Sequence, residues 1–325
     1  MTGEHRVIIR NSRNKYDFTV KRNITVLCGN SGTGKTTLYD MVRERNRYKE
    51  GSNIHLTCDK DVIALSGDEW QDRLEKIKDS IIIIDEDNDF ILTHEFARAV
   101  RDSDNYYVLV TRDYIPSLPY SVDEIYELRG NKNKTFQPVY RNSDKMYDRP
   151  PRSRLPFRPD FIITEDSKAG FQFFKNVAKP AGIECVSAEG KAKIYDTLKN
   201  YRGKNVVVIA DGAAFGAEIG NIVKQQKLAP RKIAIFLPES FEWLILSSGV
   251  VEVERDRVLR AGDYVDSRRY MSWEQYFTDL LRETTRNVPY MQYRKDKLAE
   301  YYTHGGTAEK IKEVASGIDF GGYGG

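Results

Sequence analysis

A glycine-rich stretch near the start of the chain has the residue types that hold phosphate groups. It reads GNSGTGKT over residues 29–36, follows an apolar run at 24–28 and precedes a helix-like run at 37–42. In such a loop the backbone N–H groups and the positive helix end hold the phosphates, a lysine reaches the β- and γ-phosphates, and a hydroxyl binds Mg²⁺. The alternative is a glycine-rich turn that matches by chance, and the flanking strand and helix patterns argue against it. The pattern predicts a nucleotide site made of Gly29, Asn30, Ser31, Gly32, Thr33, Gly34, Lys35, Thr36 and Thr37, with Lys35 catalytic and Thr36 a metal ligand.

An acidic pair follows a second apolar run. Four isoleucines at 81–84 predict a strand buried on both faces of a parallel sheet, and Asp85 and Glu86 come directly after it. This is where a Walker B motif belongs, so we expect Asp85 to bind Mg²⁺ and Glu86 to orient or activate the attacking water. The alternative is a strand that simply ends in a charged turn.

A second pair of acidic residues lies in the other half of the chain. Strand-like and helix-like runs alternate over residues 161–237, and Glu165 and Asp211 follow two of the strands. Sites in such sheets gather at the carboxyl ends of strands. The spacing favours a functional role for both residues over ordinary polarity at strand ends.

Composition limits the class of protein. The chain has 325 residues, of which 40% are apolar and 30% charged, which is typical of a soluble protein with two domains. Its net charge of +3 argues neither for nor against nucleic acid. Three separated cysteines fit neither a disulfide framework nor a zinc site, and no run has the length of a signal peptide core or a membrane span. We therefore expect a cytoplasmic protein without membrane contact.

The pattern divides the chain into four parts: a domain at 1–130, a linker at 131–160, a domain at 161–265 and a helical tail at 266–325. Five prolines, an excess of basic residues and interleaved aromatic residues mark the linker, which is either a stiff spacer or a surface that follows a nucleic-acid backbone. The tail shows helical spacing at 273–281 and 293–302. His304 marks a helix end, and 320–325 is a flexible end.

The first domain resembles ATPases of the ABC and SMC type. Residues 64–69, ALSGDE, are similar to their LSGGQ signature, although Asp68 replaces its second glycine, and Arg112 follows a strand in the place of their switch histidine. The segment is also shorter than an ordinary ABC domain. The resemblance implies dimerisation through Ser66 and Gly67 at a neighbour's nucleotide, hence a homo-oligomer or a partner protein.

The second domain resembles a Toprim domain. Residues 164–169, TEDSKA, are close to its first element, and Asp211 matches the first aspartate of its DxD pair, whereas Ala213 replaces the second. The resemblance implies that Glu165 and Asp211 bind Mg²⁺ or Mn²⁺ and act on nucleic-acid phosphodiesters. Carboxylates that would compensate for the missing aspartate are Asp166, Glu218, Glu239 and Glu242.

Together the two domains resemble the OLD-family nucleases, many of which are linked to phage defence. We therefore expect an α/β protein: a three-layer P-loop NTPase domain, then a Toprim-like, Rossmann-like domain and a helical tail. ATP with Mg²⁺ would drive nucleic-acid processing. The rival is a nucleotide-switched scaffold whose Toprim-like half has lost catalysis, and a third possibility, a small-molecule kinase, suits the acidic pair Asp85 and Glu86 less well.

Overall fold

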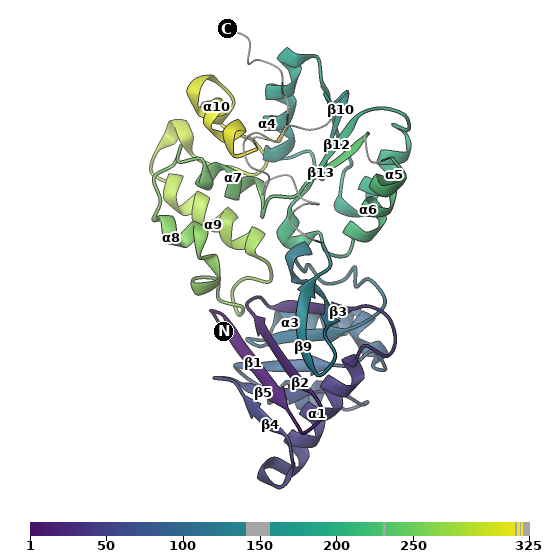
Figure 1. Cartoon of the computed structure of the whole chain (residues 1–325). Helices are drawn as coiled ribbons and strands as arrows, with labels where there is room; N and C mark the ends of the chain where they lie inside the picture. Colours follow the sequence, from purple (N-terminus) through teal and green to yellow (C-terminus); the bar gives the residue numbers. More distant parts are fainter. Residues whose placement is uncertain (141–156, 230–231, 316, 319, 321–325) are drawn as a thin grey trace. The chain divides into compact units, whose positions relative to one another are not determined.

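A computed structural model describes residues 1–140, 157–229, 232–315, 317–318 and 320. The chain forms two compact units, one made of 1–139 with 260–272 and the other of 140–259 with 273–325. Both are mixed α/β structures (Figure 1).

The first unit is built on a nine-stranded mixed sheet in the order β4-β1-β2-β9-β8-β3-β7-β6-β5. Five neighbouring strands, from β8 to β5, run parallel, and the others join them in a mixed pattern in which β1, β2 and β9 lie side by side (Figure 1). The strands are β1 (His5–Arg10), β2 (Lys15–Val20), β3 (Ile24–Cys28), β4 (His55–Thr57), β5 (Asp61–Ala64), β6 (Ser80–Ile84), β7 (Tyr106–Val110), β8 (Ile125–Arg129) and β9 (Asn133–Pro138). The helices are α1 (Lys35–Tyr48), α2 (Trp70–Leu74) and α3 (His94–Arg101).

Both faces of the parallel strands are buried, as the isoleucine run predicts. Ile81 and Ile83 belong to the core that also holds Leu38 and Val42 of α1. On β7, Tyr106 and Val108 belong to the same core as α1, whereas Tyr107 between them contacts Phe96 of α3, with ring centroids 5.9 Å apart. Because successive side chains of a strand point to opposite faces, α1 and α3 cover opposite faces of this sheet.

The first unit extends beyond residue 130, where the sequence predicts a linker. Gly130, at φ 97°, lies between β8 and β9, which pair antiparallel, and β9 also pairs with β2. β9 ends at Pro138, the first proline of the predicted linker. Residues 133–138, which the sequence assigns to the linker, therefore belong to the sheet. The part of the predicted linker at 141–156 lies outside the described residues.

Residues 260–272 belong to the first unit, although the sequence predicts that they end the second domain and begin the tail. The backbone N–H of Gly3 donates to Gly262 O at 2.8 Å. Asn23 Nδ2 donates to Ser267 O at 3.2 Å and to Tyr270 O at 3.0 Å. These contacts join residues more than 240 positions apart, which no local pattern reveals.

The second unit contains a four-stranded parallel sheet in the order β11-β10-β12-β13. Its strands are β10 (Phe161–Thr164), β11 (Glu184–Ser187), β12 (Val206–Ile209) and β13 (Ile233–Phe236). Its first helices are α4 (Ala169–Ala178), α5 (Ile194–Lys199) and α6 (Ile219–Leu228), and Figure 1 shows α5 and α6 together on one side of the sheet and α4 on the other. This confirms the predicted alternation of strands and helices.

Helices after β13 complete the second unit. They are α7 (Phe241–Ser247), α8 (Arg255–Leu259), α9 (Trp273–Thr285) and α10 (Gly305–Val314). The helix predicted at 273–281 is confirmed by α9, but a helix over 293–302 is wrong, because only the short 3₁₀ turn Glu300–Tyr302 forms there. The aromatic residues of this segment pack irregularly instead, with Tyr293 and Tyr302 both buried. His304 precedes α10 and does not end a helix, and residues 321–325 of the predicted flexible end lie outside the described residues.

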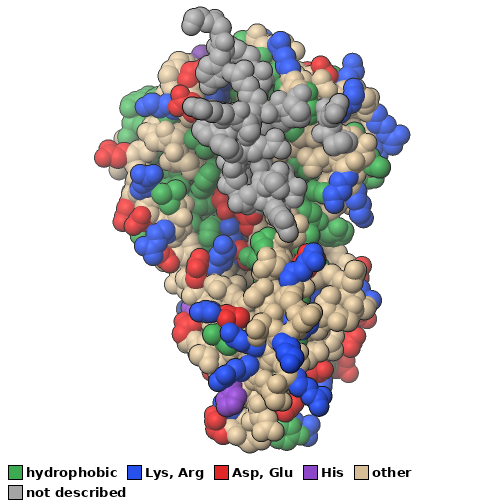
Figure 2. Space-filling model, viewed as in Figure 1, with side chains coloured by type: hydrophobic (Ala, Val, Ile, Leu, Met, Phe, Trp, Pro, Cys, Tyr) green, Lys and Arg blue, Asp and Glu red, His purple; other side chains and the backbone are tan. Residues whose placement is uncertain are grey.

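The described helices and the surface shown in Figure 2 bear on two kinds of partner, membranes and nucleic acid. Every described helix is too short or too polar to span a membrane. On the face shown in Figure 2, Lys and Arg side chains are interspersed with Asp and Glu. Among its described residues, this face therefore has no large patch of a single charge.

Candidate functional sites

The glycine-rich loop, residues 29–36, joins β3 to α1 in the first unit, as predicted. Gly29, Gly32 and Gly34 have φ values of 111°, 79° and 100°, a region that side chains disfavour. Lys35 begins α1, is buried, and its Nζ donates to Gly29 O at 2.8 Å and Asn30 O at 2.9 Å. The ammonium is therefore held inside the loop, where a phosphate would replace these carbonyl partners.

Two residues outside the motif support the loop from strands β2 and β9. Tyr16 OH donates to Gly34 O at 2.8 Å, and burial raises the pKa of this phenol to about 12. Lys134 Nζ donates to Thr33 O. Neither residue is predicted from the sequence, because Lys134 lies in the segment predicted as a linker and Tyr16 lies outside the glycine-rich motif.

Asp85 follows β6, two strands away from the loop strand β3, with β7 between them. The side chain is 3% exposed, and its Oδ1 atom has no hydrogen-bond partner among the described residues. Burial, with smaller contributions from Asp87, Glu86 and Asp40, raises the pKa of Asp85 above its usual value. A buried carboxylate oxygen without a partner fits the binding of a hard cation, so Asp85 and the exposed hydroxyl residue Thr36 suit Mg²⁺.

Glu86 is paired with the residue that follows β7. Arg112 Nε and one terminal nitrogen donate to Glu86 Oε2 and Oε1 at 3.0 and 2.7 Å. The predicted signature segment lies close in space to the loop that holds Glu86, because Leu65 N donates to Ile83 O at 3.0 Å and Gly67 N donates to Asn88 Oδ1 at 3.3 Å. A contact of Ser66 with a neighbour's nucleotide stays a prediction.

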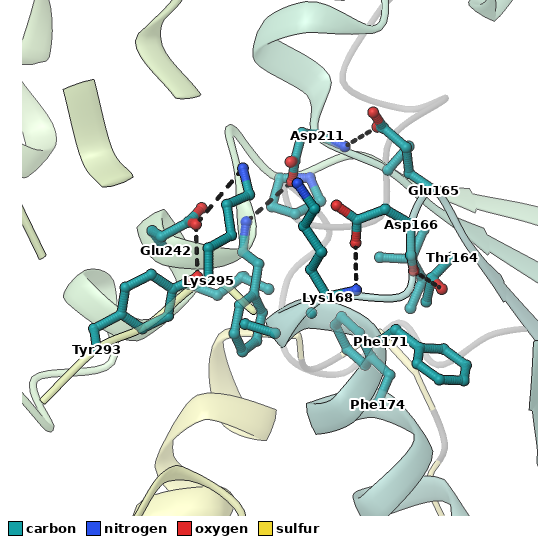
Figure 3. A pocket seen from close by; sticks show the side chains of 17 residues that line it. Thr164, Glu165, Asp166, Lys168, Phe171, Phe174, Asp211, Glu242, Tyr293 and Lys295 are labelled. Atoms are coloured by element: carbon teal, nitrogen blue, oxygen red, sulfur yellow. Dashed lines mark hydrogen bonds and ion pairs between the residues drawn. The ribbon is translucent and has the colours of Figure 1, made fainter. Parts of the chain in front are cut away.

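Glu165 and Asp211 meet at the carboxyl edge of the second sheet, as expected for neighbouring parallel strands. Thr164 pairs with Ile209, which places the two acidic residues just beyond the ends of β10 and β12. The Asp211 N–H donates to Glu165 Oε2 at 3.3 Å, and Asp211 Oδ1 accepts from Phe241 N at 3.1 Å (Figure 3). Both residues line a cavity of about 40 Å³.

Two further carboxylates and a lysine complete what we call the carboxylate cluster, namely Glu165, Asp211, Glu242 and Glu274 around Lys295. Lys295 Nζ donates to Glu274 Oε1 at 2.6 Å and lies 4.0 Å from Glu242 Oε1. Tyr293 OH also donates to Glu242 Oε1, at 2.7 Å (Figure 3). Glu242 is 1% exposed, and its Oε2 has no hydrogen-bond partner among the described residues.

Burial and mutual charge interactions shift the pKa values of three residues in the carboxylate cluster. Burial and then the Glu274 carboxylate raise the pKa of Glu165 to about 7. Burial, followed by Glu274, Glu165 and Glu242, raises the pKa of Asp211 well above its usual value. Burial lowers the pKa of Lys295, but Glu242, Glu274 and Asp211 outweigh this effect and raise it overall. Strong mutual perturbation of this kind is typical of functional sites.

The carboxylates that the sequence offers in place of the aspartate missing at Ala213 are only partly near Glu165 and Asp211, and their role as metal ligands stays a prediction. Asp166 and Glu242 line the cavity, whereas Glu239 and Glu218 do not. Gly212 makes a close approach here, because a Cβ atom would lie 2.8 Å from Leu237 O. The sequence analysis missed Glu274 and Lys295, whose helix and loop are far away along the chain.

No ready-made metal site is present in the described part of the chain: no three His, Cys, Asp or Glu side chains there are arranged to hold a metal ion. Carboxylate oxygens are nevertheless the ligands that Mg²⁺ and Mn²⁺ prefer, and the unpartnered Glu242 Oε2 faces the same cluster. The carboxylate oxygens of Glu165 and Asp211 are therefore suitable ligands for a divalent cation, next to the positively charged ammonium group of Lys295.

Comparison with known proteins adds no family. The chain matches no protein-family model and no curated protein.

Proposed function

We propose that the first unit binds ATP with Mg²⁺ and hydrolyses it. The observation that carries this proposal is the glycine-rich loop with its buried Lys35, two strands away from an Asp85 oxygen that has no hydrogen-bond partner among the described residues. The loop N–H groups and Lys35 would bind the phosphates, and Thr36 and Asp85 would hold Mg²⁺. When bound, the metal would neutralise charge at the phosphates, and Glu86 would orient the attacking water.

The carboxylate cluster of the second unit supports a role in phosphodiester chemistry on nucleic acid. Glu165 and Asp211 would hold Mg²⁺ or Mn²⁺, which polarises a phosphoryl oxygen when bound. Lys295 lines the same cavity, so its ammonium group would offset the negative charge of the phosphate. We thus propose a metal-dependent nuclease coupled to the ATPase, as in the OLD-like proteins that the sequence resembles.

A second function is favoured by one observation. Ala213 removes a metal ligand, and the Lys295 ammonium already neutralises Glu274, so the second unit can be stable without a divalent cation. In this case the protein is a nucleotide-switched scaffold that binds a partner and does not cleave.

Two substitutions test the proposal. Lys35→Ala should weaken ATP binding at least about tenfold, a loss of about 1.4 kcal/mol, and abolish hydrolysis, whereas the exposed Lys76→Ala should change neither. Unchanged ATP turnover in Lys35→Ala would contradict the ATPase assignment.

For the second unit, plasmid and single-stranded substrates are titrated with Mg²⁺ or Mn²⁺. Cleavage that is lost in Asp211→Asn and retained in Glu184→Gln, an exposed carboxylate of the same sheet, supports the nuclease. ATP turnover without cleavage at any metal concentration supports the scaffold instead.

A further inference from the structure

The ion pair between Arg112 and Glu86 occupies both oxygens of the carboxylate assigned to water activation. Its two hydrogen bonds, at 2.7 and 3.0 Å, form a fork on the carboxylate. The Glu86 side chain is 22% exposed and that of Arg112 is 58% exposed. In this arrangement each Glu86 carboxylate oxygen accepts a hydrogen bond from the guanidinium.

Strand register places Arg112 between Glu86 and the glycine-rich loop. β7 is hydrogen-bonded to β3 on one side and to β6 on the other. Leu27 pairs with Val110, so Gly29 and Arg112 each lie two residues beyond a paired position. Ile84 pairs with Leu109, so Glu86 follows the neighbouring strand at a similar level. In the strand order, Arg112 at the end of β7 therefore lies between the glycine-rich loop after β3 and Glu86 after β6.

The guanidinium can exchange one anion for the other. Its planar fork of N–H groups binds carboxylates and phosphates with the same bidentate geometry. Asp87 and Asp113 also face Arg112, and a hollow of about 290 Å³ opens beside the pair. The hollow leaves space for the exchange, and the arginine is the more exposed partner of the pair.

We propose that the Arg112–Glu86 pair is a latch that senses the terminal phosphate of the bound nucleotide. Without a triphosphate, Arg112 holds Glu86 away from water. A γ-phosphate takes over the guanidinium and releases the Glu86 carboxylate for water activation, whereas a diphosphate does not reach it. This inference rests on the proposed ATP site, and it makes hydrolysis depend on completed binding.

A double-mutant cycle on nucleotide binding tests the latch. Affinities for ADP and for a non-hydrolysable ATP analogue are measured by calorimetry with Mg²⁺ for the wild type, Glu86→Gln, Arg112→Ala and the double variant. In the wild type the Glu86 carboxylate competes with the γ-phosphate for Arg112, and Glu86→Gln weakens this competition. The substitution should therefore tighten binding of the analogue about three- to tenfold and leave the affinity for ADP unchanged. In the Arg112→Ala background this gain should vanish, and Arg112→Lys, which keeps the charge but loses the fork, should retain only part of it.

The chain offers a matched control. Arg6 makes the same forked contact with Asp17, and the two side chains are 66% and 19% exposed. Arg6→Ala should therefore leave both affinities unchanged. The latch would be overturned if Glu86→Gln raised the affinity for the analogue equally with and without Arg112, or raised the affinities for ADP and the analogue equally. Either result would leave the proposed ATP site standing, provided that binding still depends on Lys35. Absence of Lys35-dependent binding would overturn both proposals.

Discussion

Replacing Glu165 by glutamine isolates the electrostatic cost of the carboxylate cluster. Burial and Glu274 raise the pKa of Glu165 from 4.5 to about 7. The fold thus penalises the charged form, so the stability of the second unit should fall as pH rises from about 4.5 to about 7 and stay low above that range. Glutamine is neutral throughout and keeps an oxygen for the Asp211 N–H.

The magnitude follows from this rise in pKa. At about 1.4 kcal/mol per pH unit, the rise from 4.5 to about 7 corresponds to about 3 kcal/mol. Glu165 keeps partial contact with solvent and shares its titration with Asp211, so we expect a gain of about 2 kcal/mol at pH 8. At pH 5 the gain should be less than about 1 kcal/mol, because the wild-type side chain is then mostly protonated in the folded state.

Tryptophan fluorescence can follow the second unit alone. Of the three tryptophans, Trp243 and Trp273 belong to the second unit and Trp70 to the first. Urea unfolding of the full chain in a Trp70→Phe background, with EDTA present to remove divalent cations, therefore reports the second unit at pH 5 and pH 8. A gain of about 2 kcal/mol corresponds to a rise in Tm of about 4–8 °C for a domain of this size.

Two comparisons decide the outcome. Glu184→Gln replaces an exposed carboxylate of β11 and should change stability by less than about 0.5 kcal/mol at either pH. A gain for Glu165→Gln that is equal at pH 5 and pH 8, or a loss at pH 8, would refute the electrostatic reasoning.

Three further substitutions test the supports of the two sites. Gly34→Ala, at φ 100° with Lys134 Nζ and Tyr16 OH each 2.9 Å from the new Cβ, should cost about 1–3 kcal/mol in thermal unfolding and weaken ATP binding; wild-type values for both would contradict the strain. Tyr16→Phe removes the donor to Gly34 O and should cost about 1 kcal/mol and raise the KM for ATP more than it changes kcat, whereas an unchanged KM would mean that the loop is ordered without it. Tyr293→Phe leaves the buried Glu242 without its phenol donor and should destabilise the second unit by about 2 kcal/mol at pH 8, and a neutral result in urea unfolding would show that Lys295 alone satisfies this carboxylate.

The sequence predicts the local parts of both sites. The glycine-rich loop between a strand and a helix, the buried isoleucine strand before Asp85, and the meeting of Glu165 with Asp211 are all found in the structure. These predictions succeed because each depends on a short pattern: a motif, a run of β-branched residues, or the rule that parallel strands end at one edge.

The features that could not be predicted from the sequence depend on contacts between residues far apart along the chain. β9 joins the first sheet through partners on β2 and β8, and a pattern dominated by prolines and charges hides it. Glu274 and Lys295 reach the cluster from elements more than 60 positions beyond Asp211, so only packing brings them together. The aromatic spacing at 293–302 resembles a helix, but burial of Tyr293 and Tyr302 is satisfied by irregular backbone.

The return of residues 260–272 to the first unit affects how the protein is made. On the ribosome, the contacts of Gly3 and Asn23 with Gly262 and Ser267 cannot form until the chain has been synthesised beyond residue 267. Domains commonly fold in order from the amino terminus during synthesis. Here the amino-terminal unit has to wait for a segment encoded inside its neighbour, so truncation after residue 139 leaves the sheet of the first unit without part of its packing.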